Sequence, residues 1–392
     1  MVSAFLTDAE WHLTLSAIRS LGKRDIEVVA GSAEGHYFGL GSRYCKHYVR
    51  YPHPNKEYFL ESLYSLIKEE KSDVLIPMSD LILLPLSKNI KKFEDETTIP
   101  IPVFKTIMKA VDKFETFRSA CELNIPVPKT DCVDDGGLED FAQNTDYPLI
   151  VKPRMGGRAA TGVFRVNSPA ELLKAYEGIK ATFGSVIIQE YIPGGSVQMR
   201  MVNALYNKDS EAIALFTAKK LREYPITGGV TTVGESTWDP QLAELGRKLL
   251  DTWKWYGVAE IEFKVDPRDN TPKLIEVNPR FWTYLQLPIY CGVDFPYLLH
   301  KISLDEFVSP IETYKTGVKY VHPVKDVLSM LKILHNSMSR KTFFDLMSSY
   351  RGEKTYTLFS WKDPLPIFGK MISAFAGSII KGHDNQFRGI DK

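Results

Sequence analysis

The sequence predicts an α/β protein that begins with a parallel-sheet domain. Over residues 1 to about 105, short apolar runs alternate with amphipathic helical patterns, which is typical of strands joined by crossover helices. Farther along, two segments of alternating polar and apolar residues flank a cluster of turn formers at 266–272, and this pattern predicts an antiparallel hairpin. A chain of 392 residues is too long for one core and fits two or three domains.

The first 105 residues are expected to contain three strands and two helices. The strands are expected at 2–6, 26–30 and 74–77, and the helices at 13–21 and 58–70. The first strand runs into Thr-Asp-Ala-Glu at 7–10. It therefore lacks the G-x-G-x-x-G fingerprint, and nicotinamide binding loses support. Asp8 and Asp80 follow predicted strands, so they either cap the next helices, which is favoured, or line a substrate site.

A linker is expected at 99–102, because its Ile-Pro-Ile-Pro sequence disfavours helical backbone before each proline. Asp112 then precedes Glu115 by three residues, which is the spacing of a capping box and predicts a helix from this point to Leu123. Lys113 would lie in the first turn, where the helix dipole disfavours a cation unless an anion binds there. An exposed lysine without a ligand is the alternative.

A second hairpin, with a glycine-rich loop, is expected at 147–166. Its first strand ends with Lys152, and its loop contains Gly156, Gly157 and Gly162. Such a loop can bring backbone N–H groups close to phosphate oxygens and fold over them as a flap. A lysine at the base of the loop can meet the phosphate charge. An ordinary flexible turn is the alternative.

Two segments farther along carry candidate binding groups. The apolar strand expected at 186–192 enters a Pro-Gly-Gly bend at 193–195, where backbone groups, with Glu190 as an acceptor, could pair with an adenine edge. The stretch 219–232 contains Arg222 and is basic and rich in hydroxyl groups. It could receive an acidic substrate or an acyl phosphate, and a solvated basic loop is the alternative.

The antiparallel hairpin named first carries the strongest local signal. If it is symmetric about the middle of its turn, Glu262 faces Glu276 and Glu260 faces Asn278. Two carboxylates about 4 Å apart repel by about 4 kcal/mol at an effective dielectric near 20, so a cation is expected between them. Glutamate and asparagine oxygens suit Mg²⁺, and Arg280 could fork onto the same phosphate. A solvated hairpin is the alternative.

Composition excludes several classes of partner and site. A net charge of +1 gives no electrostatic reason to expect nucleic acid or an anionic membrane surface. The four cysteines form no C-x-x-C pair, so neither a zinc site nor a disulfide framework is indicated. A cytoplasmic location is the natural expectation. No stretch is long and apolar enough to span a bilayer.

Taken in order, these segments resemble the ATP-grasp superfamily. The resemblance is carried by residues 147–166, by Gln-Glu-Tyr-Ile-Pro-Gly at 189–194, by Glu262-Phe263, and by Leu-Ile-Glu-Val-Asn-Pro-Arg at 274–280. The sequence is most similar to the carbamoyl-phosphate-synthase-like and carboxylate–amine ligase branch. Its opening, with Ile-Arg-Ser-Leu-Gly at 18–22 and Ser-Arg-Tyr-Cys at 42–45, is similar to the domain that precedes the grasp in D-aspartate-ligase-like members.

The resemblance covers residues 1 to about 305. It implies a Rossmann-like parallel-sheet domain at 1–105, followed by a two-lobed α+β ATP-grasp domain at 106–305 whose flap lobe lies at about 125–190.

The remaining residues, 306–392, are expected to form a small, mostly helical C-terminal appendage. Helical patterns cover 317–335 and 341–349. The appendage would close the substrate pocket or form a homodimer contact. The most apolar stretch, 366–380, is interrupted by Lys370 and is expected as a packed amphipathic helix, with a membrane-surface role as the alternative.

The resemblance also implies how the nucleotide and metal are held. The implied nucleotide contacts are the phosphate lysines Lys113 and Lys152, the flap glycines Gly156, Gly157 and Gly162, and the adenine hinge of Glu190 with the backbone of Tyr191 and Ile192. The implied ligands of Mg²⁺, or alternatively Mn²⁺, are Glu262, Glu276 and Asn278, with Arg280 on the transferred phosphate. Many members carry an acidic residue for the ribose hydroxyls. This chain has Ser196, Val197 and Gln198 there, so Ser196 or Gln198 is expected to replace it.

The expected function is an ATP- and magnesium-dependent, ADP-producing ligase that activates a small carboxylic or amino acid as an acyl phosphate and joins it to an amine. Lys113, Lys152 and Arg280 would offset charge on the moving phosphoryl group, and Arg222 would lie at the acceptor end. The alternatives are carbamoyl-phosphate-synthase-like phosphorylation of bicarbonate or carbamate, and a nucleotide-binding protein without turnover. The expected partners are the small carboxylate and amine substrates.

Overall fold

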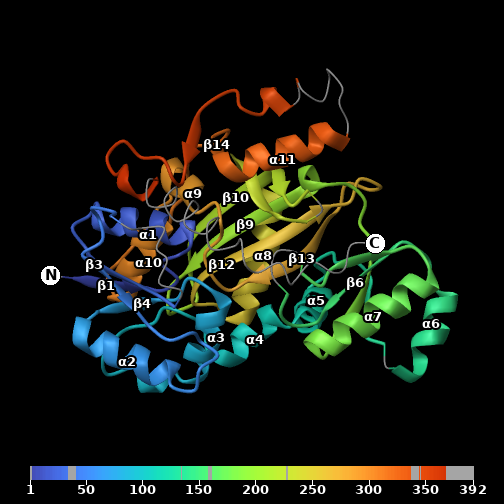
Figure 1. Ribbon diagram of the computed structural model, residues 1–392, viewed down its shortest axis with the longest axis horizontal. Helices are drawn as coiled ribbons and strands as arrows, with labels where there is room; N and C mark the ends of the chain where they lie inside the picture. Colours follow the sequence, from blue (N-terminus) through green and yellow to red (C-terminus); the bar gives the residue numbers. More distant parts are fainter. Residues whose placement is uncertain are drawn as a thin grey trace, which may run out of the picture.

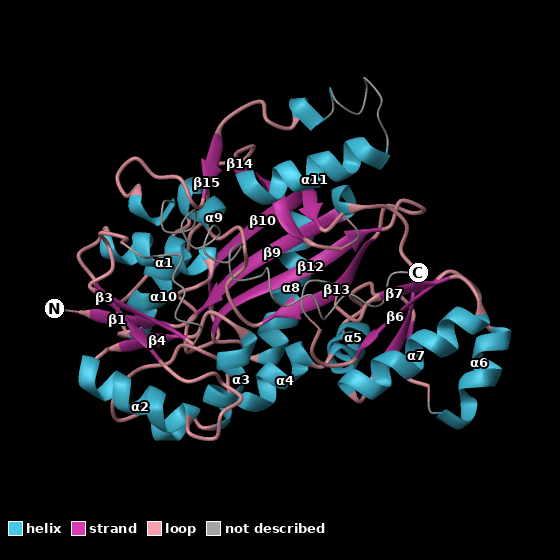
Figure 2. Cartoon of the chain, in the orientation of Figure 1, coloured by secondary structure: helices cyan, strands magenta, loops and turns pink. Residues whose placement is uncertain are grey.

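The computed structural model describes residues 2–33, 41–133, 135–157, 161–226, 228–336, 344 and 346–367. The described strands form three sheets of four, seven and four strands. In Figure 1 the N-terminal sheet lies at the left, the large sheet in the centre and the second four-stranded sheet at the right. Figure 2 shows α2, α6, α7 and α11 at the periphery of the molecule.

The N-terminal sheet is entirely parallel, with strand order β3-β2-β1-β4. Its strands are β1 (Ser3–Leu6), β2 (Glu27–Ser32), β3 (His47–Arg50) and β4 (Val74–Ile76), and its helices are α1 (His12–Gly22), α2 (Phe59–Glu70) and α3 (Asp80–Lys88). The predicted parallel sheet is therefore confirmed. The sequence pattern missed β3, because its four residues include a single aliphatic side chain.

A helical connection links this sheet to the next one. It consists of the short 3₁₀ turn η1 (Ile90–Lys92), α4 (Phe104–Val111) and α5 (Lys113–Glu122). The carboxylate of Asp112 accepts hydrogen bonds from the backbone N–H groups of Phe114 and Glu115. The predicted cap at Asp112 is confirmed, so α5 begins at Lys113 and presents this lysine in its first turn.

The second four-stranded sheet is antiparallel, with strand order β5-β8-β6-β7. Its strands are β5 (Thr130–Asp131), β6 (Leu149–Pro153), β7 (Phe164–Val166) and β8 (Val186–Glu190), and η2 (Asp135–Gly137), α6 (Leu138–Asn144) and α7 (Pro169–Phe183) complete this part. Leu138, Ala142, Leu172, Tyr176 and Ile179 of the two α-helices pack on Val151 and Ile188 of the sheet. This small separate core makes residues 130–190 a lobe of their own.

The large sheet has strand order β13-β12-β9-β10-β11-β14-β15. Its strands are β9 (Met199–Tyr206), β10 (Ala212–Tyr224), β11 (Val230–Thr237), β12 (Gly257–Val265), β13 (Pro272–Asn278), β14 (Lys319–Val321) and β15 (Lys354–Tyr356). The associated helices are η3 (Ser196–Gln198), α8 (Pro240–Trp253), α9 (Gln286–Cys291), α10 (Phe295–Ser303) and α11 (Pro323–Asn336). One face of β9, β12 and β13 packs against α8.

The C-terminal part differs from the expected appendage. Residues 319–321, expected as helix, form β14, which pairs with β11, and β15 pairs with β14. The helix begins only at Pro323, because the preceding buried residues Val318, Tyr320 and Val321 suit a strand between two neighbours. Two strands beyond residue 305 therefore continue the large sheet. Of the helix expected at 341–349, residues 344 and 346–348 are helical, and 341–343 and 345 lie outside the described residues. The apolar stretch 366–380 lies mostly outside them.

The first and last parts of the chain are held together by buried contacts. Helix α1 shares a core with α9, α10 and β14 through residues such as Leu13, Leu21 and Phe295. Nε of Arg19 lies 2.8 Å from Oδ2 of Asp363, and both side chains are almost fully buried. Among the described residues, none of the helices has the length and apolar character needed to cross a membrane.

Candidate functional site

The register of β12 and β13 sets four polar side chains side by side. Glu262 pairs with Glu276, and Glu260 pairs with Asn278. This is the register that the symmetry argument predicts. The ladder then shifts by one residue, since Phe263 pairs with Leu274. The apolar residues of both strands face α8, so the acidic ones face the opposite side of the sheet.

The amide of Asn278 lies among three carboxylates. Its Nδ2 is 3.3 Å from Oε2 of Glu260, 3.2 Å from Oε1 of Glu262 and 3.5 Å from Oε1 of Glu276. Glu260 is buried and also accepts a 2.8 Å hydrogen bond from the hydroxyl of Tyr284. One amide group thus bridges three carboxylates whose charges repel one another.

The pKa values of the two opposed glutamates are shifted in opposite directions. Burial, followed by the charges of Glu260 and Glu276, raises the pKa of Glu262 well above its ordinary value. Burial acts in the same sense on Glu276, but the positive charges of Lys113, Lys152 and Arg280 outweigh it and lower its pKa. Glu276 therefore carries the negative charge of the pair, while Glu262 readily takes a proton.

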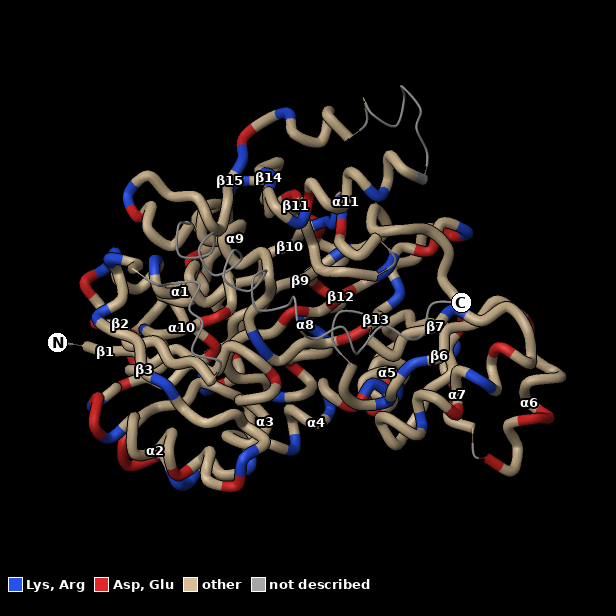
Figure 3. Tube along the Cα trace, in the orientation of Figure 1, with Lys and Arg blue, Asp and Glu red and all other residues tan. Residues whose placement is uncertain are grey.

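Three cations approach this acidic cluster from three different elements. Lys113 begins α5, Lys152 lies on β6, and Arg280 follows β13; the charge of each acts on Glu276. In Figure 3 the acidic residues of β12 and β13 lie in the middle of the molecule, with basic residues of α5 and β6 to their right. A site that collects both signs of charge suits an anionic ligand that carries a metal ion.

Lys152 is buried and lies against an aromatic ring. Its Nζ is 5.2 Å from the ring centroid of Phe117, and the side chain is 5% exposed. Burial, followed by the charge of Lys113, lowers its pKa to about 7, and the nearby charge of Glu276 opposes that shift. A phosphate group bound beside Lys152 would supply a negative partner and favour the protonated form of its side chain.

Lys113 is tied to the start of the glycine loop. Its backbone N–H donates to the carbonyl of Arg154, and its Nζ donates to the carbonyl of Gly156, both at 3.1 Å. Gly156, Gly157 and Gly162 all have positive φ angles between 75° and 79°, which favours glycine. The loop residues 158–160 lie outside the described parts of the chain.

Arg280 connects the acidic cluster to the N-terminal sheet. Its Nη2 donates to Oδ1 of Asn278 and its Nε donates to Oδ2 of Asp80, both at 3.1 Å. Asp80 is the first residue of α3, after β4. The expected capping role is wrong for both aspartates, since Asp80 pairs with Arg280 and the carboxylate of Asp8 accepts from the hydroxyls of Ser79 and Thr7.

The hinge residues are only partly available for adenine. The carboxylate of Glu190 pairs with Arg268 and Lys273 and accepts from the backbone N–H of Lys129. This side chain is therefore not free to accept from an amino group as expected. The guanidinium of Arg165 lies 4.3 Å from the ring centroid of Tyr191.

The neighbouring Ile192 is engaged through its carbonyl, which accepts a hydrogen bond from Nζ of Lys264 at 2.8 Å. Nζ of Lys264 also lies 5.5 Å from the ring centroid of Tyr191. Lys264 thus holds this end of the hinge from the large sheet.

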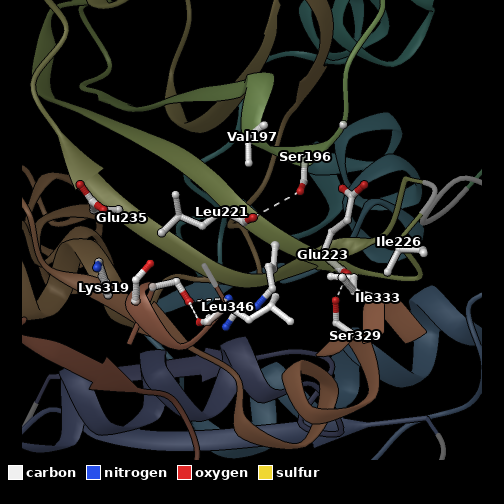
Figure 4. Close-up of a pocket in the computed structure, with 14 residues that line it drawn as sticks. Ser196, Val197, Leu221, Glu223, Ile226, Glu235, Lys319, Ser329, Ile333 and Leu346 are labelled. Atoms are coloured by element: carbon white, nitrogen blue, oxygen red, sulfur yellow. Dashed lines mark hydrogen bonds between the residues drawn. The ribbon is translucent and has the colours of Figure 1, made fainter. Parts of the chain in front are cut away.

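Ser196 and Arg222 lie around a different hollow, a cavity of about 670 Å³ shown in Figure 4. The hydroxyl of Ser196 points to the carbonyl oxygen of Leu221, at 3.4 Å. None of the predicted magnesium ligands or phosphate lysines lines this cavity. A ribose contact by Ser196, as expected, would therefore lie outside the group of magnesium ligands and phosphate lysines.

Arg222 also departs from its expected role. Its Nε and Nη2 pair with the two carboxylate oxygens of the fully buried Asp326, at 2.8 and 2.7 Å, and its Nη1 contacts the hydroxyl of Ser349 and the carbonyl of Leu346. The guanidinium joins β10 to α11 and is not free to contact an acceptor. Residue spacing could not reveal this, because Asp326 lies 104 positions away.

The donor set suits a divalent cation that brings ligands of its own. Within the described ranges, no three His, Cys, Asp or Glu side chains are arranged to hold a metal ion by themselves. Two glutamate oxygens remain, and the amide of Asn278, whose Oδ1 accepts from Arg280, would have to turn over to add its oxygen. Mg²⁺ commonly takes a few protein oxygens and completes its octahedron with phosphate and water. Burial, and then repulsion from Glu260 and Glu276, raises the pKa of Glu262, and such a cation would relieve the repulsion. The residues therefore fit magnesium.

Lys220 belongs to the basic stretch 219–232, in which the sequence analysis gave Arg222, and not Lys220, a specific role. It lies on β10, is 7% exposed, and donates through Nζ to Glu223 and to the carbonyl of Gly229. Burial alone would lower its pKa, but the charges of Glu262 and Glu223 raise it. The signal available in the sequence was its place in the basic run Lys219-Lys220-Leu221-Arg222, which does not show which of these cations is buried.

Comparison with known families agrees with this geometry. Residues 110–284 match the family described as "ATP-grasp domain". This range holds α5 and the glycine hairpin, the hinge, and the hairpin that carries Glu262, Glu276 and Asn278.

Curated relatives and solved structures extend the likeness. The chain is 23% identical over 243 residues to the D-aspartate ligase of Enterococcus faecium (strain Aus0004), covering 57% of this chain and 58% of that protein. Its fold is similar to biotin carboxylase from Campylobacter jejuni (TM-score 0.67, 17% identity, 81% of this chain and 74% of that one). It is also similar to L-amino acid ligase from Bacillus licheniformis (TM-score 0.57, 16% identity, 79% of this chain and 75% of that one).

Proposed function

Because residues 110–284 are an ATP-grasp domain, we propose that this protein is an ATP- and magnesium-dependent carboxylate–amine ligase. It would phosphorylate the carboxylate of a small acid with ATP, form an acyl phosphate and ADP, and pass the acyl group to an amine. The observation that carries the proposal is the convergence of Lys113, Lys152 and Arg280 on Glu276, opposite Glu262.

The magnesium ion would be held by Glu262, Glu276 and Asn278 and would supply positive charge next to the nucleotide phosphates. The chain's own cations do the rest. Lys152 offers a buried ammonium group at the base of the glycine loop, and Arg280 offers a planar guanidinium beside Asn278. Fixed charges in an enclosed site stabilise the developing negative charge of the phosphoryl group better than water does.

The remaining elements would orient the nucleotide and exclude water. Lys113 already contacts the backbone at Gly156, so a phosphate bound there would also order the glycine loop. Closure of the loop protects an acyl phosphate from hydrolysis. We propose that adenine pairs with the backbone of Tyr191 and Ile192, and that Glu190 stays with Arg268 and Lys273 and holds the hinge in place.

We propose amino acids as the substrates. The likeness to a D-aspartate ligase and to an L-amino acid ligase supports this choice. An acyl phosphate presented to the α-amino or side-chain amino group of a second molecule then yields an amide and phosphate. The charges of Glu262 and Glu223 act on the ammonium group of Lys220. We propose that this cation lies beside the carboxylate group of the acid substrate. Arg222 is assigned to holding β10 on α11.

The test is ADP formation from ATP and Mg²⁺ across a panel of D- and L-amino acids, beginning with D-aspartate. Hydroxylamine is added in parallel, because it converts an acyl phosphate to a hydroxamate that can be weighed by mass spectrometry. A hydroxamate and a new amide, both dependent on one amino acid, are expected. Glu276→Gln should abolish both products, and Glu244→Gln, which changes an exposed glutamate on α8, should retain them.

The two competing functions give different results in the same assay. Bicarbonate-dependent ADP formation without any hydroxamate from the amino acid panel would favour phosphorylation of bicarbonate. Nucleotide binding that is tight in titration calorimetry, with no ADP formed under any condition, would favour a binding protein without turnover. Either result would overturn the ligase.

A further inference from the structure

Helix α11 turns its apolar face away from the protein. Val324, Val327, Leu328 and Leu331 are spaced so that they share one face of the helix, and they are 55%, 53%, 44% and 61% exposed. We call these four residues the α11 stripe. The described part of the chain leaves this stripe open to solvent.

The inward face of α11 is polar, and its contacts explain the orientation. Asp326 is fully buried, pairs with Arg222, and accepts from the hydroxyl of Thr232 at 2.8 Å. Ser329 is also fully buried and donates to the carbonyl of Glu223 at 2.8 Å. Turning the helix to bury the stripe would leave the buried Arg222 without its charge partner, which is strongly destabilising. The outward apolar face is therefore fixed by the fold.

A second exposed apolar group lies at the same end of the sheet. The rings of Phe359 and Trp361 form an edge-to-face pair with centroids 4.7 Å apart, and Trp361 is 85% exposed. Strands β14 and β15 are parallel, and α11 follows β14 while this aromatic pair follows β15. Both groups therefore leave the large sheet at its same edge.

Basic charge accompanies these apolar groups. The described residues within 313–367 include seven Lys and Arg and three Asp and Glu, a net charge of +4, whereas the whole chain carries +1. Two of the acidic residues, Asp326 and Asp363, are buried in pairs with Arg222 and Arg19. Lys332 on α11 and Lys362 beside Trp361 are exposed.

We propose that the α11 stripe and the Phe359–Trp361 pair form a face that binds the surface of an anionic lipid bilayer. Aliphatic residues on one side of a helix, an exposed tryptophan and flanking lysines are what an interfacial membrane contact requires. A second copy of the chain fits less well, because a two-fold contact would set like charges against each other. The nearly neutral total charge hid this asymmetry. The inference does not depend on the proposed activity.

The test is co-sedimentation of the full chain with vesicles. Vesicles of phosphatidylcholine are compared with vesicles that contain about 30 mol% phosphatidylserine, at about 0.1 M and about 0.5 M salt. We expect binding to the anionic vesicles that is at least about tenfold tighter than to the neutral ones and that weakens at high salt.

Two double variants separate the contributions. Val327→Ser with Leu331→Ser should weaken anionic-vesicle binding by at least about fivefold by removing apolar insertion. Lys332→Glu with Lys362→Glu should do the same through charge. Phe307→Ser is the matched control, since Phe307 is 84% exposed but lies outside this face. All these side chains are exposed, so unchanged thermal unfolding is expected and serves as the folding check.

Two results would overturn the proposal. One is wild-type protein that sediments equally with neutral and anionic vesicles, or with neither. The other is a wild-type dimer, measured by light scattering, that Val327→Ser with Leu331→Ser converts to a monomer, because the stripe would then be covered by a second copy.

Discussion

The guanidinium of Arg280 contacts the carboxylate of Asp80 across 200 residues of sequence, with Nε 3.1 Å from Oδ2. Arg280 follows the hairpin that carries the acidic cluster, while Asp80 begins α3 after a strand of the N-terminal sheet. One ion pair thus joins the two parts of the protein at the candidate site. A shift of the N-terminal sheet would therefore move the guanidinium of Arg280, the proposed phosphate contact.

Asp80→Asn should lower the turnover number for ADP formation by about tenfold or more. The guanidinium of Arg280 would keep its hydrogen bonds to Asn278 and to the carbonyl of Phe281. It would lose the negative charge that holds its Nε in place. The KM for ATP should change less than the turnover number, because Lys113 and Lys152 are untouched. Steady-state kinetics measure both constants. If the turnover number falls and the KM for ATP rises by the same factor, and the unfolding temperature is also lower, Asp80 is only a structural residue.

The opposed glutamates should respond to substitution with opposite changes in stability. Glu262→Gln should raise the free energy of unfolding of the nucleotide-free protein by about 1 kcal/mol, because burial and neighbouring charges disfavour its ionised form. Glu276→Gln should lower it by a similar amount, because the charge that faces three cations is lost. Urea unfolding without magnesium at pH 8 measures both.

Both glutamine variants should lose magnesium-dependent ADP formation by at least about 100-fold. Both should also lose the rise in unfolding temperature that ATP with Mg²⁺ gives the wild type. Stability changes of the same sign in the two variants would contradict the assignment of charge within the pair.

Lys152 should make the stability of the nucleotide-free protein depend on pH. Its pKa is lowered by burial from the ordinary value of 10.5 to about 7. Between these two values the unfolded chain holds a proton that the folded chain lacks, so the free energy of unfolding rises with pH across this window. Below about pH 7 both states are protonated and this contribution to the slope disappears.

The comparison is wild type against Lys152→Met in urea unfolding from pH 6 to pH 10. The variant should lack the part of the slope that comes from Lys152, a difference of several kcal/mol at most. Parallel pH curves for the two proteins would contradict this prediction, because they would show that Lys152 stays protonated.

A second measurement uses nucleotide binding at pH 8. If Lys152 is neutral in the free protein, binding should take up a proton in the wild type and not in Lys152→Met, which calorimetry in buffers of different ionisation enthalpy detects.

The buried pair of Arg19 and Asp363 should be the strongest single link between the C-terminal part and α1. Asp363 also accepts from the hydroxyl of Ser42 and the backbone N–H of Arg43. Asp363→Ala should lower the free energy of unfolding by about 3–5 kcal/mol, because it leaves Arg19 buried without its charge partner. Arg19→Met combined with Asp363→Leu should recover much of that loss. A change below about 1 kcal/mol in urea unfolding of Asp363→Ala would argue against this role.

Local patterns predicted much of the architecture. Strands β1, β2, β4, β6, β8, β12 and β13 and helices α1, α2 and α5 were expected within a few residues of their observed bounds, because side-chain period and caps are local properties. The pairing of Glu262 with Glu276 followed from turn symmetry alone. The C-terminal strands were missed, since strands of three residues carry no periodic signal.

Local residue patterns predicted most of the elements, the acidic hairpin and the residue types that suit a magnesium nucleotide. They could not predict which cations reach that hairpin and which are already engaged, because this depends on how distant segments pack. Lys152 meets Glu276, whereas Arg222 is held by Asp326 and Glu190 by Arg268 and Lys273. The physical reason is that charge pairing acts through space, so a partner about 100 positions away competes with a ligand on equal terms.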